Sequence, residues 1–358
     1  MKTALPALIA LLIFNAACDG EPTDLPGSGD PLPTATPASQ GLDEAKLADA
    51  TARIAREVGS RHCTVIVKNG HVVSETYNSG DRNTAHNVQS LSKNLGATLI
   101  GVAVTDGLLA LDDKVSRYIT PPSAMHPEAT IRHVISQTSQ SADLNRPTFR
   151  YDVTGGEVLN SLNDVVLAAT GRRAYDYARE RLLSRLGISH SRWGNSSTGR
   201  LEFGAGASFT CREMAKLGQL YLNNGKWQGD TILSEDFIRQ AVRPNYKDAN
   251  TIYGYTWYLN SNRDNETWKD ANAGTKYGKI IKDAGSSFIA GFGFLSQIQL
   301  VSRYHNAVVV TLGTTISLDL AHPDKSSDQA WPAVAKAVDS GVYQGPFEGA
   351  YFSGEAIP

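Results

Sequence analysis

The sequence predicts a mixed α/β (α+β) fold, in which both ends of the chain contribute to one sheet and a helical part is inserted between them. Runs of β-favouring residues lie near both ends, at 63–78 and 286–313. The segments between these runs carry apolar residues at helical spacing. The chain has 358 residues, 41% of them hydrophobic, so it can build one large domain or two small domains with a substantial core.

The folded part is predicted to begin with a helix and a hairpin. Residues 42–58 are predicted to form an amphipathic helix, because apolar side chains recur at helical spacing among alternating charges (Leu47, Ala50 and Ile54). Residues 63–78 ("CTVIVKNGHVVSETYN") hold two β-rich runs on either side of an Asn-Gly pair. An Asn-Gly pair between such runs is the strongest short signal for a β-hairpin.

The next segment, "QSLSKNLGATLIG" at 89–101, is predicted to be a helix that begins near Ser90. Apolar side chains recur in this region every three to four residues: Leu91, Leu95, Leu99 and Val102. Gly107 suits the position just after the end of this helix. A backbone N–H at the start of a helix has no partner within the helix, so the Ser90 N–H is available to another group.

Further helices and strands are predicted along the rest of the chain. Helical periodicity predicts three helical segments in its middle: 130–138, 163–188 and 210–227. Two strand-like runs follow, and after them a last helix with a proline in its first turn: 286–301, 306–313 and 326–343.

The N-terminal residues 1–18 are predicted to be a lipoprotein signal peptide. A positive Lys2 precedes an apolar run that is too short for an ordinary transmembrane helix. Small residues then lead to Cys18, which is the predicted lipidation site. Residues 19–41 are rich in Pro, Gly, Ser, Thr and acidic residues, which predicts a disordered tether between the lipid and the domain.

The predicted domain spans residues 42–345 and is followed by a short tail at 346–358. If Cys18 carries lipid, only Cys63 and Cys211 remain in the chain. An exported protein can join two cysteines in a disulfide. Because the sequence does not give their separation in space, a disulfide and two buried thiols both stay open.

Ser90 and Lys93 are three residues apart, so on a helix they lie on one face. A serine hydroxyl is a weak nucleophile until a base takes its proton, and a lysine with a lowered pKa can be that base. The Ser90 N–H can then bind the oxyanion that forms. The S-x-x-K pattern alone is weak, since roughly one match is expected by chance in a chain of this length. The alternative is two ordinary polar residues at a helix start.

A longer series of segments resembles the serine β-lactamase and penicillin-binding protein superfamily. The resemblance spans about residues 43–340 and is carried in order by five segments: 88–119, 130–139, 149–188, 209–244 and 288–301. It is closest to the class C-like esterase and 6-aminohexanoate-dimer hydrolase branch. The resemblance implies a three-layer α/β domain around an antiparallel sheet and a helical domain, with the active site between them.

The resemblance also implies which residues act. Ser90 matches the nucleophile of the superfamily and Lys93 matches its base. Tyr151 matches the tyrosine of a Y-x-N or Y-x-S motif, whose phenol can relay a proton to the leaving group. The alternative for Tyr151 is an aromatic residue of the core or rim with a hydrogen-bonded hydroxyl.

The segment "AGFGFLSQ" resembles the glycine-rich strand of this branch, which ends in glutamine. By this match, the Phe294 N–H lies opposite the Ser90 N–H and completes the oxyanion hole. Gly291 and Gly293 then let the substrate approach the backbone closely. An ordinary bulge in a strand is the alternative for the two glycines.

Two positions depart from the superfamily pattern. Val153 stands where an amide or hydroxyl side chain is usual. The K-T-G triad of β-lactamases and DD-peptidases is absent from the segment around Ile289–Gly291, and the sequence "KYG" at Lys276–Gly278 lies too far upstream to replace it. Because that lysine helps to hold a substrate carboxylate, strong β-lactamase activity is not expected.

Other function classes lack their usual signals. The net charge of -2 does not favour nucleic acid as a partner. The sequence has no H-E-x-x-H, C-x-x-C, P-loop or G-x-S-x-G motif, so no metal or other cofactor is expected.

The sequence therefore predicts an exported serine hydrolase that cleaves esters or small amides and is lipid-anchored in the bacterial cell envelope, with a periplasmic domain. The alternative enzyme is a DD-peptidase, penicillin-binding protein or β-lactamase. The alternative of another class is a catalytically inactive envelope binding protein. The sequence does not predict the oligomeric state.

Overall fold

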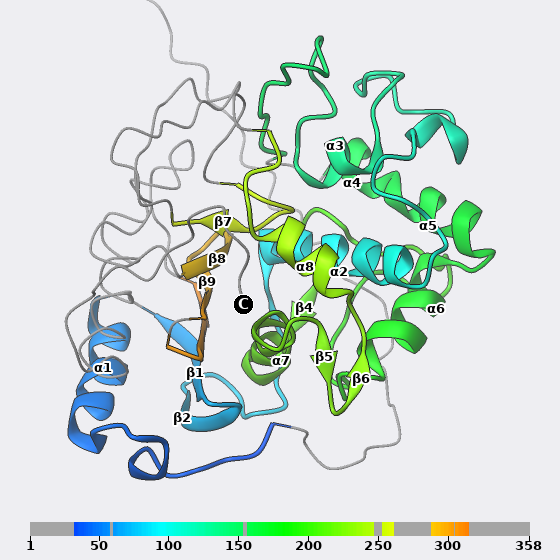
Figure 1. Ribbon diagram of the computed structural model, residues 1–358. Coiled ribbons are helices and arrows are strands. Elements are labelled where there is room, and N and C mark those ends of the chain that lie inside the picture. The colour runs from blue at the N-terminus through cyan, green and yellow to red at the C-terminus, as the bar shows by residue number, and fades with distance from the viewer. Residues whose placement is uncertain are drawn as a thin grey trace, which may run out of the picture.

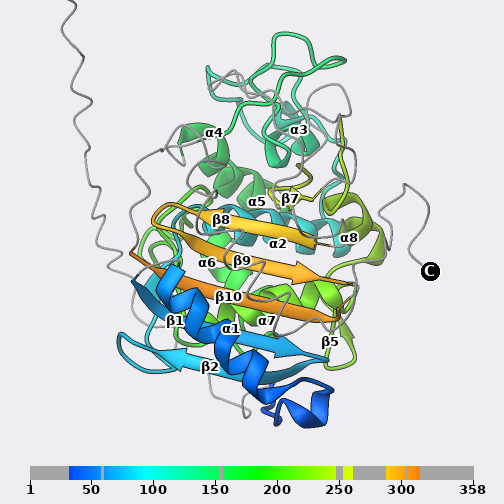
Figure 2. The same cartoon turned by 90° about the vertical axis from the view of Figure 1, so that its left-hand side faces the viewer.

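The computed structural model describes residues 32–57, 60–152, 156–246, 253–260, 288–303 and 305–314. A six-stranded antiparallel sheet with the order β2-β1-β10-β9-β8-β7 organises this part of the chain. Helix α1 covers one face of the sheet, and α2 and α7 cover the other (Figures 1 and 2). This arrangement confirms the predicted α/β fold.

The elements have the following bounds. The strands of the large sheet are β1 (Arg61–Lys68), β2 (His71–Tyr77), β7 (Tyr258–Leu259), β8 (Phe288–Gly293), β9 (Gln297–Ser302) and β10 (Ala307–Gly313). Two small ribbons pair β3 (His86–Asn87) with β4 (Ser208–Phe209) and β5 (Lys226–Trp227) with β6 (Asp230–Thr231). The α-helices are α1 (Glu44–Glu57), α2 (Ser92–Thr105), α3 (Ile131–Ile135), α4 (Glu157–Asn160), α5 (Leu162–Thr170), α6 (Ala174–Ala178), α7 (Cys211–Leu222) and α8 (Glu235–Ala241). Single turns of other helix types are η1 (Ala38–Gln40), η2 (Gln89–Leu91), η3 (Val115–Arg117) and η4 (Arg179–Leu183).

Strand β10 lies at the centre of the fold, between β1 and β9. Its side chains alternate between the two faces of the sheet, as a strand requires. Val308 and Val310 belong to the core shared with α2 and α7, while Val309 belongs to the core shared with α1. Since β1 comes from the start of the domain, its pairing with β10 confirms that segments from both ends of the chain share one sheet.

The predicted helix and hairpin at the start of the domain are confirmed. In α1 the three predicted apolar side chains are buried against the sheet: Leu47, Ala50 and Ile54. Between β1 and β2, Asn69 and Gly70 have φ values of 51° and 75°. A two-residue hairpin turn with two positive φ values is the type that Asn-Gly favours.

The prediction of a disordered tether at 19–41 is wrong for residues 32–41. Leu32 is only 2% exposed, and its carbonyl accepts a hydrogen bond from the Arg212 side chain at 3.2 Å. Thr34 forms a parallel bridge with Val72 of the edge strand β2. The segment has few apolar residues, which suggested disorder. Its composition could not show that the edge strand β2 offers unpaired backbone groups to which the segment can bind. Residues 1–31, with the predicted signal peptide and Cys18, lie outside the described residues.

The strand-like run at 286–301 is two strands rather than one. Strands β8 and β9 pair directly and are joined by the turn Phe294-Leu295-Ser296. Leu295 and Ser296 have φ values of 64° and 61°, which reverse the chain. Neither residue is a glycine or proline, so this segment carries no clear turn signal. The last helix predicted at 326–343 and the tail at 346–358 fall outside the described part. Among the residues that the structure describes, no helix combines the length and the apolar character needed to cross a bilayer.

Cys63 and Cys211 form a disulfide, which decides between the two alternatives left by the sequence. Cys63 lies in β1 and Cys211 is the first residue of α7, and both are almost completely buried. The bond therefore ties the sheet to the helix beneath it. Thr210 and Glu213 form a capping box around the same helix start, so the disulfide and the capping box both stabilise this end of α7.

We expect the paired substitution Cys63→Ala and Cys211→Ala to lower the free energy of unfolding by about 2 to 5 kcal/mol, because the bond closes a long loop in the unfolded chain. Thermal melting of the purified full chain, followed by circular dichroism, measures the loss. A reducing agent should lower the melting temperature of the wild type and leave the paired variant unchanged. Equal melting temperatures for the two oxidised proteins would contradict a stabilising role for the bond.

Candidate active site

Ser90 lies in the turn η2, which runs directly into α2. The hydroxyl is thus at the head of the predicted helix, in a single tight turn before the α-helix itself. The preceding residue Gln89 has a φ of 50°, and its N–H donates to the Asn87 side chain at 2.8 Å. The Val88 N–H donates to the Ala207 carbonyl at 2.8 Å, which attaches the turn to the strand segment that leads into β4. These bonds fix the backbone on the N-terminal side of Ser90.

Lys93 lies in the first turn of α2 and is 2% exposed. Its Nζ is 3.0 Å from the Ser90 Oγ and 2.8 Å from the Gly204 carbonyl oxygen. The structure therefore brings the predicted serine and lysine into hydrogen-bond contact. The Gly204 carbonyl is a partner that the sequence did not predict, because it comes from a loop more than a hundred residues further along the chain.

Burial lowers the pKa of Lys93 to about 8, because the ammonium form loses its contact with water. The Asp152 carboxylate acts in the opposite direction and raises this pKa. Burial is the larger effect, so a large fraction of the amine is neutral in mildly alkaline solution. A neutral amine beside a serine hydroxyl can accept its proton.

Tyr151 also lies beside Lys93. The Lys93 Nζ is 4.8 Å from the centre of the Tyr151 ring. On its other sides, the tyrosine ring contacts an aromatic cluster with centroid distances of 6.3 to 6.5 Å: Phe149, Tyr253 and Tyr258. The structure thus unites Tyr151 with the predicted pair, and it also shows the aromatic packing that was the alternative for this residue. Val153 lies outside the described residues.

Strand β8 passes directly against the turn that carries Ser90. A Cβ atom added at Gly291 would lie 2.7 Å from Leu91 Cδ2, and one added at Gly293 would lie 2.5 Å from the Val88 carbonyl oxygen. At Gly293 the obstacle is backbone, so this position needs glycine, whereas at Gly291 it is the end of a leucine side chain that can shift. The glycines let the strand contact the turn closely, and the predicted approach of substrate to them stays a prediction.

Phe294 follows Gly293 in the turn between β8 and β9, and its side chain is 38% exposed. The Phe294 carbonyl accepts a hydrogen bond from the Gln297 side chain at 3.0 Å. The same side chain exchanges two hydrogen bonds with the backbone of Gly313 at the end of β10. Gln297 therefore ties the turn to the neighbouring strand, and it gives a structural role to the glutamine that ends the glycine-rich segment. The segment Lys276–Gly278, which the sequence places too far upstream to replace the K-T-G triad, falls in a part of the chain that the structure does not describe.

The sequence model of the family described as Beta-lactamase matches residues 63–314, a range that holds Ser90, Lys93, Tyr151 and strand β8. The chain belongs to the beta-lactamase family. The superfamily resemblance predicted from the sequence is thereby confirmed.

Several solved structures are similar to this beta-lactamase family protein. A Bacillus anthracis protein assigned as a 6-aminohexanoate-dimer hydrolase is 18% identical, with a TM-score of 0.58 over 78% of this chain and 80% of the other. A beta-lactamase from Mycobacterium bovis is 17% identical, with a TM-score of 0.58 over 81% and 98%. A family VIII carboxylesterase is 13% identical, with a TM-score of 0.57 over 81% and 97%. At these identities the likeness shows the shared fold.

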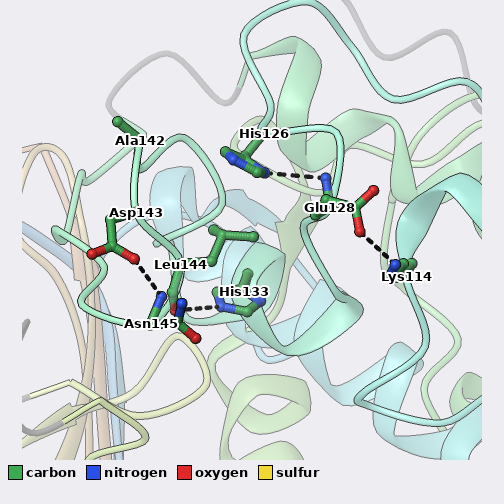
Figure 3. Close-up of a pocket in the computed structure, with 8 residues that line it drawn as sticks. All are labelled: Lys114, His126, Glu128, His133, Ala142, Asp143, Leu144 and Asn145. Atoms are coloured by element: carbon green, nitrogen blue, oxygen red, sulfur yellow. Dashed lines mark hydrogen bonds and ion pairs between the residues drawn. The ribbon is translucent and has the colours of Figure 1, made fainter.

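A hollow of this beta-lactamase family protein lies beside α3 and has a volume of about 500 Å³ (Figure 3). Its eight lining residues include neither Ser90 nor Lys93. Lys114 forms an ion pair with Glu128, whose N–H donates to His126 Nδ1 at 3.1 Å, and the Asp143 carboxylate accepts the Asn145 N–H at 2.9 Å. We assign this hollow no role. Within the described segments, no group of three or more His, Cys, Asp or Glu is placed to hold a metal ion.

The lowered pKa of Lys93 predicts how stability depends on pH. The unfolded chain keeps this proton up to about pH 10.4, whereas the folded protein releases it near pH 8, so stability rises with pH between these values. We expect the wild type to gain about 3 kcal/mol relative to Lys93→Met between about pH 7 and about pH 10.4. Chemical denaturation at both pH values measures the gain.

Lys46→Met is the matched control for this experiment, because it removes the same charge from an exposed position on α1. It corrects for the general effect of one lost cation. If the stabilities of wild type and Lys93→Met change in parallel over this pH range, Lys93 does not carry a lowered pKa in the folded protein.

Proposed function

We propose that this beta-lactamase family protein is an exported serine hydrolase that cleaves esters or small amides through an acyl-enzyme on Ser90. The observation that carries the proposal is the 3.0 Å contact between the Ser90 hydroxyl and the amine of a completely buried Lys93. Burying a lysine is costly unless its surroundings compensate for the lost water. Here burial lowers the pKa of the Lys93 amine to about 8, so a base lies within hydrogen-bond distance of the Ser90 hydroxyl.

In the proposed reaction, neutral Lys93 takes the hydroxyl proton while Ser90 Oγ bonds to the substrate carbonyl carbon. The backbone N–H groups of Ser90 and Phe294 hold the oxyanion. The bond to the leaving group then breaks, and the leaving group receives the proton from the Lys93 ammonium, directly or through the Tyr151 hydroxyl. Water adds to the acyl-enzyme, and the carboxylic acid leaves with Ser90 restored.

The choice of esters and small amides rests on the third element of the site. Strand β8, which lies against the nucleophile turn, has the sequence "FIAGFG" and provides no cation for a substrate carboxylate. Penicillins and D-Ala-D-Ala ends carry such a carboxylate. The fold itself is shared by a carboxylesterase, by a protein assigned as a 6-aminohexanoate-dimer hydrolase and by a beta-lactamase, so the choice depends on the strand.

We expect a fluorophosphonate to add once to the wild type, not to add to Ser90→Ala, and to add far more slowly to Lys93→Met. Intact mass spectrometry measures the adduct. The labelling rate of the wild type should rise with pH through about 8, because only the deprotonated amine can take the serine proton.

Two results would redirect the assignment. A folded wild type without any adduct would contradict the hydrolase proposal and favour an inactive envelope binding protein. Stable labelling of Ser90 by a fluorescent penicillin, with no turnover of simple esters, would favour the penicillin-binding alternative. A panel of esters and amides with varied acyl groups then identifies the substrate class.

We also propose that the protein is exported and anchored by lipid on Cys18, with its domain in the periplasm. The signal-like N-terminus supports this proposal, and so does the disulfide between Cys63 and Cys211, because such bonds persist mainly in oxidising compartments. Several acyl chains on one cysteine hold a protein firmly at a membrane.

We expect the wild type to sediment with membranes and to enter the detergent phase, and Cys18→Ala to lose both properties. Phase partitioning followed by immunoblotting measures this, and mass spectrometry of the N-terminal peptide identifies the acyl group. The paired variant Cys63→Ala and Cys211→Ala, which keeps Cys18 and leaves no unpaired thiol from the disulfide, controls for the loss of other cysteines in the same assay. Equal partitioning of wild type and Cys18→Ala would contradict the lipid anchor.

A further inference from the structure

The chain leaves helix α3 through Gln137, whose backbone conformation is unusual for a glutamine. Its φ is 57°, its N–H donates to the Val134 carbonyl at 3.0 Å, and the Thr138 N–H donates to the His133 carbonyl at 2.8 Å. This pair of bonds is the Schellman motif, in which the left-handed position is usually a glycine. A glutamine is strained there, because a side chain disfavours the left-handed conformation. The strain raises the question of what the side chain does.

The Gln137 side chain is buried and holds the segment that carries Tyr151. Its Oε1 accepts the Asp152 N–H at 2.6 Å, and its main-chain carbonyl accepts the Arg150 N–H at 2.9 Å. One residue therefore binds both neighbours of Tyr151 in the sequence. Because the two bonds fix the backbone on either side, they limit how far the tyrosine can move.

The side-chain amide nitrogen of Gln137 supports the Tyr151 ring indirectly, through a neighbouring tyrosine. Gln137 Nε2 donates to the Tyr253 hydroxyl. The Tyr253 ring stands edge-on to the Tyr151 ring, with centroids 6.5 Å apart and an interplanar angle of 85°. Gln137 thus supports Tyr151 through its backbone and through an aromatic neighbour. All these hydrogen bonds join Gln137 to other groups of the protein, so they do not involve substrate.

We infer that Gln137 is a positioning residue that keeps Tyr151 beside the Lys93 amine, where the tyrosine can pass a proton to the leaving group. This inference rests on the proposed function. It accounts for a buried glutamine at a backbone position where glycine is favoured. It also separates two tasks: Lys93 activates Ser90, and the Gln137 clamp serves only the step in which the leaving group departs.

The leaving group provides a test that a general structural defect cannot imitate. An alkoxide is a poor leaving group and needs a proton as its bond breaks, whereas p-nitrophenolate departs readily without one. The ratio of kcat/KM for an ethyl ester and a p-nitrophenyl ester of the same acid therefore reports proton delivery. Because kcat/KM covers only the steps up to acylation, the shared deacylation step does not affect this ratio.

The central variant is Gln137→Gly in the purified full chain. Glycine suits the left-handed backbone and keeps the main-chain carbonyl, so the variant should fold while it lacks the amide. We expect kcat/KM for the ethyl ester to fall at least about tenfold more than for the p-nitrophenyl ester, as also expected for Tyr151→Phe. Fluorophosphonate labelling should stay within about threefold of the wild-type rate, since its fluoride leaving group needs little help from an acid.

Gln228→Gly is the matched control, because Gln228 is an exposed glutamine with a φ of 48° in the turn between β5 and β6. It should leave the ratio unchanged. If Gln137→Gly does not fold, Gln137→Met gives the decisive measurement, since it keeps the side-chain length and removes both polar groups.

Three outcomes have distinct meanings. A selective loss on the ethyl ester supports the inference. An equal loss on both esters, or no loss, in a folded Gln137 variant overturns the inference, while the labelling of Ser90 still supports the proposed function. A wild type that neither labels nor turns over either ester overturns the proposed function and the inference with it.

Discussion

The structure depends most on one constraint. The amine of a lysine must be shielded from water and stay within hydrogen-bond distance of a serine hydroxyl. Removing an amine from water is unfavourable unless neighbouring groups accept its hydrogen bonds. Lys93 meets this condition with two partners, the Ser90 hydroxyl and the Gly204 carbonyl. The loop that carries Gly204 and the Tyr151 ring, whose centre is 4.8 Å from Nζ, lie directly against the amine.

The sheet provides the rigidity that this constraint requires. The pairing of β1 with β10 joins two ends of the chain, and the disulfide between Cys63 and Cys211 fixes β1 to α7. The residue just before α7, Thr210, follows strand β4, and β4 pairs with the strand that precedes Ser90. The position of the turn that carries Ser90 is therefore set by the core of the protein. Glycine at 293 lets β8 close against that turn, because a Cβ atom there would lie 2.5 Å from the Val88 carbonyl oxygen.

The sequence predicted the parts of this arrangement that depend on local spacing. Three-residue spacing was enough to place Ser90 beside Lys93, and Asn-Gly was enough for the hairpin between β1 and β2. The sequence did not predict contacts between distant segments, such as the packing of Leu32 or the bond from Lys93 to Gly204. It also did not predict that Gly291 and Gly293 lie close to the turn that carries Ser90. Such contacts exist only after the chain has folded, so no local pattern indicates them.

The bond from Lys93 to Gly204 has a consequence for how the protein can evolve. Its acceptor is a main-chain carbonyl, which every amino acid possesses. A mutation at position 204 changes the side chain of the loop and leaves the acceptor in the chain. The loop can therefore change in sequence without removing the partner that holds the Lys93 amine. A side-chain acceptor would have tied the chemistry of the site to the identity of one residue.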